Sequence, residues 1–158
     1  MANDRLLAIY LQDHFAAAAA ARSRCRAARD SNRGTATGEF LAGLLREVDE
    51  DAETLRRVLA RVGVEPSKPK LAAGLVVERL GRLKLNGQLT GYSPLSRLVE
   101  LEALLLGVEG KRRLWLALGE LDDARLAELD FGALAQRAEA QREGLEEHRL
   151  AAVETALR

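Results

Sequence analysis

Proline occurs at only three positions of the 158-residue chain, at Pro66, Pro69 and Pro94. Proline in the interior of a helix removes a hydrogen bond and clashes with the preceding turn. The long segments between these prolines and the chain ends are therefore free to form helices. None of these segments shows the apolar–polar alternation that is typical of half-buried strands. The chain is predicted to be all-α.

Turn and capping residues divide the chain into four long predicted helices and one short one. Thr37, Ser93 and Asp130 stand where helix N-caps are expected, and Pro94 suits the first position of a helix. The long helices are expected over residues 4–30, 38–62, 94–118 and 131–157, with a shorter helix over residues 71–84.

Helices of matched length favour a bundle, and each of these is about 39 Å long at the helical rise of ~1.5 Å per residue. Short loops make the first and second helices antiparallel, and the third and fourth likewise. About 30 residues join the two hairpins, which is enough to run back along the bundle. This crossover would make the second and third helices parallel, and residues 1–158 would form a single domain.

Two antiparallel hairpins joined by a long crossover resemble the ferritin-like superfamily, over nearly the whole chain. The resemblance implies a four-helix bundle with a short accessory helix in the crossover. Metal-binding members carry a Glu on two helices and Glu-x-x-His on the other two. No Glu-x-x-His occurs in this sequence, whose two histidines are His14 and His148. A ferritin-type di-metal centre is therefore not expected, and no bound metal or cofactor is predicted.

Helical wheels place one polar group of each long helix in a layer near the middle of the bundle. His14 lies within an apolar seam, Asp51 among leucines, Glu109 on the predicted inner face of the third helix and Gln141 on the flank of the fourth. Their heights, measured from the end where the first helix finishes, are about 21 to 25 Å by the helical rise. A second layer lies about two turns away. The candidate residues of the two layers are His14, Asp51, Glu102, Glu109 and His148.

A carboxylate in this layer must be paired, protonated or metal-bound, because an isolated buried charge is costly. We expect a structural network in which His14 pairs with Asp51 or Glu109, and Glu109 pairs with Arg113. The alternative is a degenerate metal- or small-ligand-binding site. Its carboxylates would neutralise a divalent cation and its histidines would add nitrogen ligands.

The first helix carries six consecutive alanines, Ala16 to Ala21. Ala17, Ala18 and Ala21 face the predicted seam, where methyl side chains allow a neighbouring helix to approach closely beside His14. The remaining alanines widen the apolar surface of this helix beyond a single seam. A helix with two apolar faces has two sets of neighbours.

The third helix also shows two apolar faces. Its solvent side is predicted from Arg97, Glu100 and Lys111, which places Leu95, Leu98, Val99 and Leu106 inside. A second stripe then points outward, formed by Leu101, Leu104, Val108 and Trp115. Monomers rarely expose a large apolar patch. We therefore expect a homodimer, with the single tryptophan as its anchor.

Composition excludes several classes of partner. The formal net charge is zero, and the arginines between Arg22 and Arg29 have no aromatic residues among them, so nucleic-acid binding is not expected. No apolar run approaches the ~20 residues of a membrane span. The single cysteine, Cys25, excludes an internal disulfide and is expected in the core. Twenty arginines against four lysines suggest a GC-rich bacterial genome. We expect a cytoplasmic, non-enzymatic scaffold or interaction protein with no catalytic residues.

Overall fold

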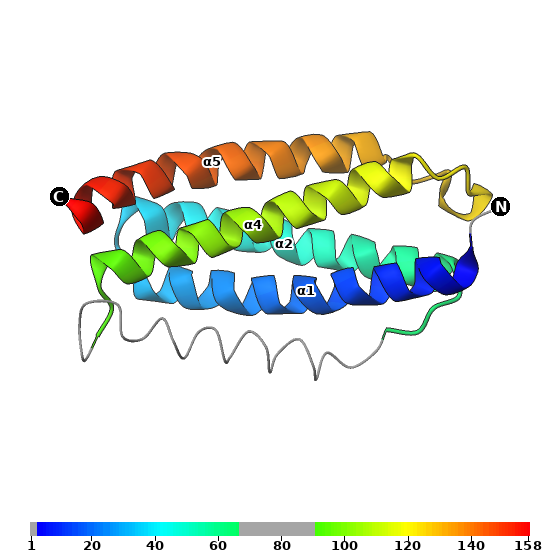
Figure 1. Ribbon diagram of the computed structural model, residues 1–158, viewed down its shortest axis with the longest axis horizontal. Coiled ribbons are helices and arrows are strands. Elements are labelled where there is room, and N and C mark those ends of the chain that lie inside the picture. Colours follow the sequence, from blue (N-terminus) through cyan, green and yellow to red (C-terminus); the bar gives the residue numbers. More distant parts are fainter. Residues whose placement is uncertain (1–2, 67–90) are drawn as a thin grey trace.

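The computed structural model describes residues 3–66 and 91–158. Over these residues the chain forms long α-helices and one short 3-10 helix and contains no strand (Figure 1), so the all-α prediction is confirmed. The predicted helix over residues 71–84 lies outside the described residues. The elements are α1 (Asp4–Ser31), α2 (Ala36–Arg61), α4 (Pro94–Gly119), η1 (Ala124–Leu126) and α5 (Phe131–Leu157).

Each long helix begins after a residue whose side-chain oxygen accepts a hydrogen bond from a backbone N–H three residues later. Such a cap satisfies one of the unpaired donors of the first turn. Ser93 and Asp130 are caps as predicted. The prediction that Thr37 is the N-cap of the second helix is wrong. This helix, α2, is capped by Thr35, which follows a tight turn at Gly34 with φ of 75°. The four N-caps and their acceptor distances are Asn3 (3.2 Å), Thr35 (3.1 Å), Ser93 (3.1 Å) and Asp130 (2.9 Å).

The four helices form a bundle in which α1 packs against α2 and α4, and α5 packs against α4 and α2. Figure 1 shows that α2 and α4 run in the same direction, while α1 and α5 run in the opposite direction. The turn between α1 and α2 lies at one end of the bundle and the connection through η1 lies at the other. Every packed pair of neighbours is therefore antiparallel.

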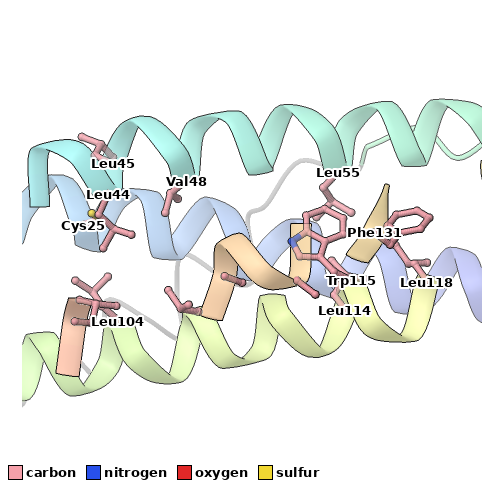
Figure 2. Close-up of a cluster of buried hydrophobic side chains, with 14 of the residues drawn as sticks. Cys25, Leu44, Leu45, Val48, Leu55, Leu104, Leu114, Trp115, Leu118 and Phe131 are labelled. Atoms are coloured by element: carbon pink, nitrogen blue, oxygen red, sulfur yellow. The ribbon is translucent and has the colours of Figure 1, made fainter. Parts of the chain in front are cut away.

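The core is built mostly of leucine, and the predicted inner faces of α1, α2 and α5 are largely confirmed. Leu11, Leu41 and Leu145 are fully buried at 0% exposure. Trp115 is 1% exposed and lies near Leu55 and Leu114, with its ring stacked on Phe131 at a centroid distance of 6.2 Å (Figure 2). Leucine-to-alanine changes at buried positions typically cost about 2–5 kcal/mol. These side chains therefore dominate the stability of the bundle.

The predicted orientation of α4 is wrong. The buried residues of this helix include the stripe that was expected to point outward, whereas Leu106 is 77% exposed. Lys111, expected in solvent, points into the bundle, and its side chain is only 16% exposed. The expected dimer anchor, Trp115, is a core residue. The buried side chains of α4 are Leu98, Leu101, Leu104, Val108, Leu114, Trp115 and Leu118.

A second inward polar group on α4 is Glu100, which was also expected in solvent. Its Oε2 accepts a hydrogen bond of 2.7 Å from the Tyr92 hydroxyl, and burial raises the pKa of Glu100. Asn32 is buried in the turn between α1 and α2 and donates through Nδ2 to the same hydroxyl at 2.8 Å. This chain of hydrogen bonds joins the first hairpin to the beginning of α4.

Among the helices of the described residues, none combines the length and apolarity that a bilayer crossing requires.

Candidate functional site

Asp51 is the centre of a polar network in the middle of the bundle. Its side chain is 2% exposed. Lys111 Nζ donates to Asp51 Oδ2 and Arg137 Nη2 donates to Asp51 Oδ1, so both carboxylate oxygens are bound by cations. Burial of Asp51 was predicted, but the two cations that neutralise it were not.

Gln141 and two further carboxylates complete the network. Gln141 accepts a hydrogen bond from Lys111 Nζ, and its own Nε2 donates to Glu47 Oε2 at 2.8 Å. Arg137 Nη1 donates to Glu50 Oε2 at 2.9 Å. The network thus contains two cations and three carboxylates, drawn from α2, α4 and α5.

Burial affects the pKa of both cations, but the net shift is downward for Lys111 and upward for Arg137. Burial lowers the pKa of Lys111 below its ordinary value, and the charge and hydrogen bond of Asp51 oppose this effect only in part. Burial also acts to lower the pKa of Arg137, but the hydrogen bond and charge of Asp51, together with the charges of Glu50 and Glu47, outweigh burial, and the pKa is raised. Both groups are held in place by the carboxylate that they neutralise, which makes the network a structural one.

His14 reaches the same level of the bundle but does not join the network. Its ring makes an edge-to-face contact with Tyr10 at 4.6 Å between centroids. Burial lowers the pKa of His14, and the nearby charge of Asp13 only partly offsets this effect. No hydrogen bond links His14 to Asp51 or Glu109 within the described part of the chain, so that predicted pairing is wrong.

The three remaining candidates lie away from the core. Glu109 is 35% exposed and accepts a hydrogen bond of 2.6 Å from Arg113 Nε, the pairing that was predicted. Glu102 is 48% exposed, with Arg149 at 3.7 Å. They are solvent-facing because α4 is rotated relative to its predicted orientation.

His148 lies on the flank of α5, beside the beginning of α2. Its Nδ1 is 3.2 Å from the Thr37 hydroxyl, and its ring packs on Phe40 at a centroid distance of 4.6 Å. Burial lowers the pKa of His148, with a smaller opposing effect from Glu147. It does not come together with the other four candidates.

The described residues contain no group of three or more His, Cys, Asp or Glu side chains that could hold a metal ion. Asp51, the one fully buried carboxylate among the five candidates, is already bound by Lys111 and Arg137. A divalent cation at this position would have to displace both of them. The observed donor set therefore does not fit the predicted metal alternative.

Beside the network lies a cavity of about 190 Å³ between α1, α2 and α4, which opens to solvent beside the exposed residues Ala17, Leu106 and Gly107. One wall consists of small residues, Ala17, Ala18 and Ala21 on α1, facing Gly107 and Gly110 on α4. A Cβ added at Gly107 would lie 3.8 Å from the Ala21 methyl, whereas one at Gly110 would meet no atom within 4 Å. The remaining walls are apolar, formed mainly by Leu44, Val48, Leu55, Leu104, Val108, Leu114 and Trp115.

Among the described residues, the polar side chains that line this cavity are His14, Asp51 and Lys111. They lie in a lining that is otherwise largely apolar. A concave, mostly apolar space with a few convergent polar groups is the usual form of a small-molecule site. The alanine run thus has a structural role: three of its methyl groups leave this space open.

Cys25 is in the core, as predicted, and does not line the cavity. It is fully buried, and its Sγ lies 3.8 Å from the Leu41 carbonyl oxygen. Burial raises the pKa of its thiol to about 11. The thiol is therefore protonated at neutral pH and inaccessible to solvent.

Lys111 and Arg137 are the cations of the network, and sequence reasoning missed both. A signal for Lys111 was available, because it lies two residues from Glu109 and therefore at nearly the same height as Asp51. A buried carboxylate needs a cation nearby. Searching each helix for a cation at that height would have found Lys111, and would have found Arg137 one turn before Gln141.

Over the described residues, the fold and the site define an all-α four-helix bundle with a mostly apolar cavity beside an ionic network. Comparisons of the sequence and structure with protein-family models, curated proteins and solved structures give no match.

Proposed function

We propose that this protein is a non-enzymatic binding protein that holds a small, largely apolar molecule in the cavity between α1, α2 and α4. The observation that carries the proposal is the cavity itself, because a concave and mostly apolar space with a few convergent polar groups is the usual form of a small-molecule site. An apolar cavity of ~150 Å³ stays dry and binds benzene. The cavity of about 190 Å³ found here would suit a molecule with one or two rings.

The lining supports binding rather than catalysis. Lys111 and Asp51 already pair with each other, so neither offers a free base or acid. In the part of the lining that the structure describes, His14 is the one titratable group outside that pair. A general acid–base site normally poises a group within hydrogen-bonding distance of a second polar group that orients it, and Tyr10 contacts His14 only through its ring.

The arrangement of helices supports our second proposal, that the bundle belongs with the ferritin-like scaffolds. The parallel direction of α2 and α4 is the feature that a crossover between two hairpins requires (Figure 1). In this proposal the scaffold has an ionic network where metal-binding members have their di-metal centre. The binding site lies beside that network.

Toluene is a suitable first probe, titrated into ¹⁵N-labelled protein and followed by ¹H–¹⁵N correlation spectra. We expect amide resonances around the cavity to shift, and the midpoint of thermal unfolding to rise. Gly110→Leu should abolish both effects, because the new side chain projects into the open space beside Gly110. Gly43→Leu is the matched control, since a Cβ at Gly43 would meet only the end of the Arg46 side chain, at 3.9 Å.

A natural ligand can be sought in parallel. Protein purified under native conditions would be extracted with organic solvent, and the extract analysed by mass spectrometry. We expect a small molecule that is present with the wild type and the Gly43→Leu variant and absent with Gly110→Leu. Toluene binding that is equally strong in Gly110→Leu, or absent from the wild type, would contradict the proposal.

A further inference from the structure

We propose that the molecule bound in this cavity is an amphiphile with one unbranched alkyl chain, which lies along the bundle axis while its polar end stays in solvent at the mouth of the cavity. The inference rests on the proposed binding function and adds the chemical class of the ligand.

The first observation is the length of the cavity. Figure 2 shows Leu104 toward one end of the lining and Leu114 and Trp115 toward the other. On α1 the lining runs from His14 to Ala21, which is about 10 Å at the helical rise. A compact cavity of about 190 Å³ would be only ~7 Å across, so a lining of this length indicates an elongated space. One or two rings would match the volume but would leave the length unfilled.

The second observation is that one end of this space is open and the other is closed. Leu106 is 77% exposed and Gly107 is also exposed, so the cavity reaches solvent beside them. Leu55, Leu114 and Trp115 line the other end and are only 1 or 2% exposed. Between Gly107 and Trp115, α4 rises about 12 Å. A chain that enters at the mouth therefore has about 12 Å before it meets the closed end.

The third observation is the width of the mouth. A Cβ added at Gly107 would lie 3.8 Å from the Ala21 methyl group, an ordinary van der Waals contact, so α1 and α4 approach closely at this level. A Cβ added at Gly110 would meet no atom within 4 Å, so there is more room one turn further in. Because the contact at Gly107 limits the mouth on one side, a slender chain enters more readily than a branched or polycyclic molecule.

The chemistry of the walls also suits an alkyl chain. Alanine, glycine, leucine and valine make up most of the lining. Lys111 and Asp51 line the cavity as well, but they are bonded to each other and need no partner from a ligand. Methylene groups require no hydrogen bond, whereas a polar group at the closed end would be left unpaired. The polar end of the ligand therefore belongs at the mouth, beside Leu106.

The length of the cavity sets the length of the chain. An extended alkyl chain advances ~1.25 Å per carbon, given C–C bonds of about 1.5 Å. A space of about 10 to 12 Å along the helices therefore holds about eight to ten carbons.

A series of primary alcohols from butanol to dodecanol tests this inference. The affinity of each alcohol for the wild type would be measured by isothermal titration calorimetry, and displacement of toluene by ¹H–¹⁵N correlation spectra. Each further buried methylene group should raise the affinity about fourfold. We expect this rise to stop at about eight to ten carbons, where the chain reaches the closed end, and the alcohols to displace toluene.

A variant that fills the closed end should shorten the preferred chain. Ala52 lines the cavity on α2, three residues before Leu55. In Ala52→Leu the rise should stop about two carbons earlier, because the added carbons of leucine occupy the space of the chain end. Ala60→Leu is the matched control, since Ala60 is an exposed residue of the same helix, and its series should match that of the wild type.

The outcomes separate the inference from the proposal on which it rests. If toluene binds but the rise stops at about four or five carbons, or continues through dodecanol, the alkyl-chain inference is wrong while the binding function stands. The inference is also wrong if Ala52→Leu folds, as judged by far-ultraviolet circular dichroism, and stops the rise at the same length as Ala60→Leu. If Ala52→Leu does not fold, the wild-type series decides alone. If neither toluene nor any alcohol binds to the wild type, the binding function is wrong and the inference falls with it.

Discussion

Replacing Lys111 by methionine should destabilise the bundle more than any comparable change of a surface cation. The substitution keeps a side chain of similar length and removes the charge that binds Asp51 Oδ2. Asp51 is 2% exposed, so water cannot take the place of the missing ammonium group. Removing one partner of a buried ion pair typically costs about 3–5 kcal/mol.

The expected cost is about 2–4 kcal/mol, slightly below that range, because Arg137 still binds the other carboxylate oxygen. For a domain of this size, the midpoint of thermal unfolding shifts by roughly 2–4 °C per kcal/mol. Urea denaturation followed by far-ultraviolet circular dichroism would give the free energy of unfolding. Arg113→Met is the matched control, since Arg113 is 69% exposed and pairs with Glu109 at the surface. Its loss should cost under ~0.5 kcal/mol.

A double-mutant cycle separates the ion pair from the loss of packing. Asp51→Asn combined with Lys111→Met removes both charges of the pair. We expect the double variant to be more stable than the sum of the single effects predicts, by about 1 kcal/mol or more. Additive effects, or a Lys111→Met cost as small as that of Arg113→Met, would refute the reasoning that Lys111 neutralises a buried charge.

Four further predictions concern other parts of the molecule. Gly38→Ala should lower the unfolding free energy by about 1–3 kcal/mol in urea denaturation, because its Cβ would lie 2.1 Å from the Asn32 carbonyl oxygen; Gly43→Ala, with no such contact, should not be destabilising. The pKa of His14 is lowered in the folded state from 6.5, so the unfolded chain binds the proton first as the pH falls. The unfolding free energy should therefore decrease from near pH 6.5 down to the folded-state pKa, and less so in His14→Gln; an unchanged pH profile in that variant would contradict this. The stripe first assigned to a dimer interface is buried, but Leu106 on α4 is 77% exposed, so light scattering coupled to gel filtration should show a homodimer that Leu106→Glu weakens; a monomer at tens of micromolar would exclude it. Elemental analysis after native purification without a His-tag should find iron, manganese and zinc substoichiometric, and one equivalent or more would count against the proposed function.

The inner face of α2, and to a lesser degree that of α1, was predictable because polar and apolar residues are separated around the helix. The face of α4 was not, because leucine and valine occur around its whole circumference. Because the aliphatic residues do not mark one side of α4 as apolar, the positions of its charged residues decided which side was predicted to face solvent. Lys111 then misled it, since this lysine is a buried cation whose partner lies on another helix.

The candidate site, too, could be predicted from the sequence only in part. Asp51 could be placed in the core and at the right height from α2 alone, because its neighbours in sequence include core leucines. The heights of Lys111 and Arg137 along their helices could be estimated from the sequence, but their direction toward Asp51 could not, since it depends on the rotation of α4 and α5 about their own axes. The cavity was also beyond reach, because the alanine run suggested close contact between helices rather than a space between them.

The wall formed by Ala17, Ala18, Ala21, Gly107 and Gly110 has a consequence for how this bundle could evolve. One nucleotide change converts an alanine codon into one for valine, threonine, serine or glycine, and a glycine codon into one for alanine, serine or valine. Each such change would resize the cavity or add a hydroxyl to it, without altering the leucines and the ionic network that hold the helices together. Ligand preference could therefore diverge among descendants of this chain in small steps, each open to selection, while the stability of the bundle stayed nearly constant.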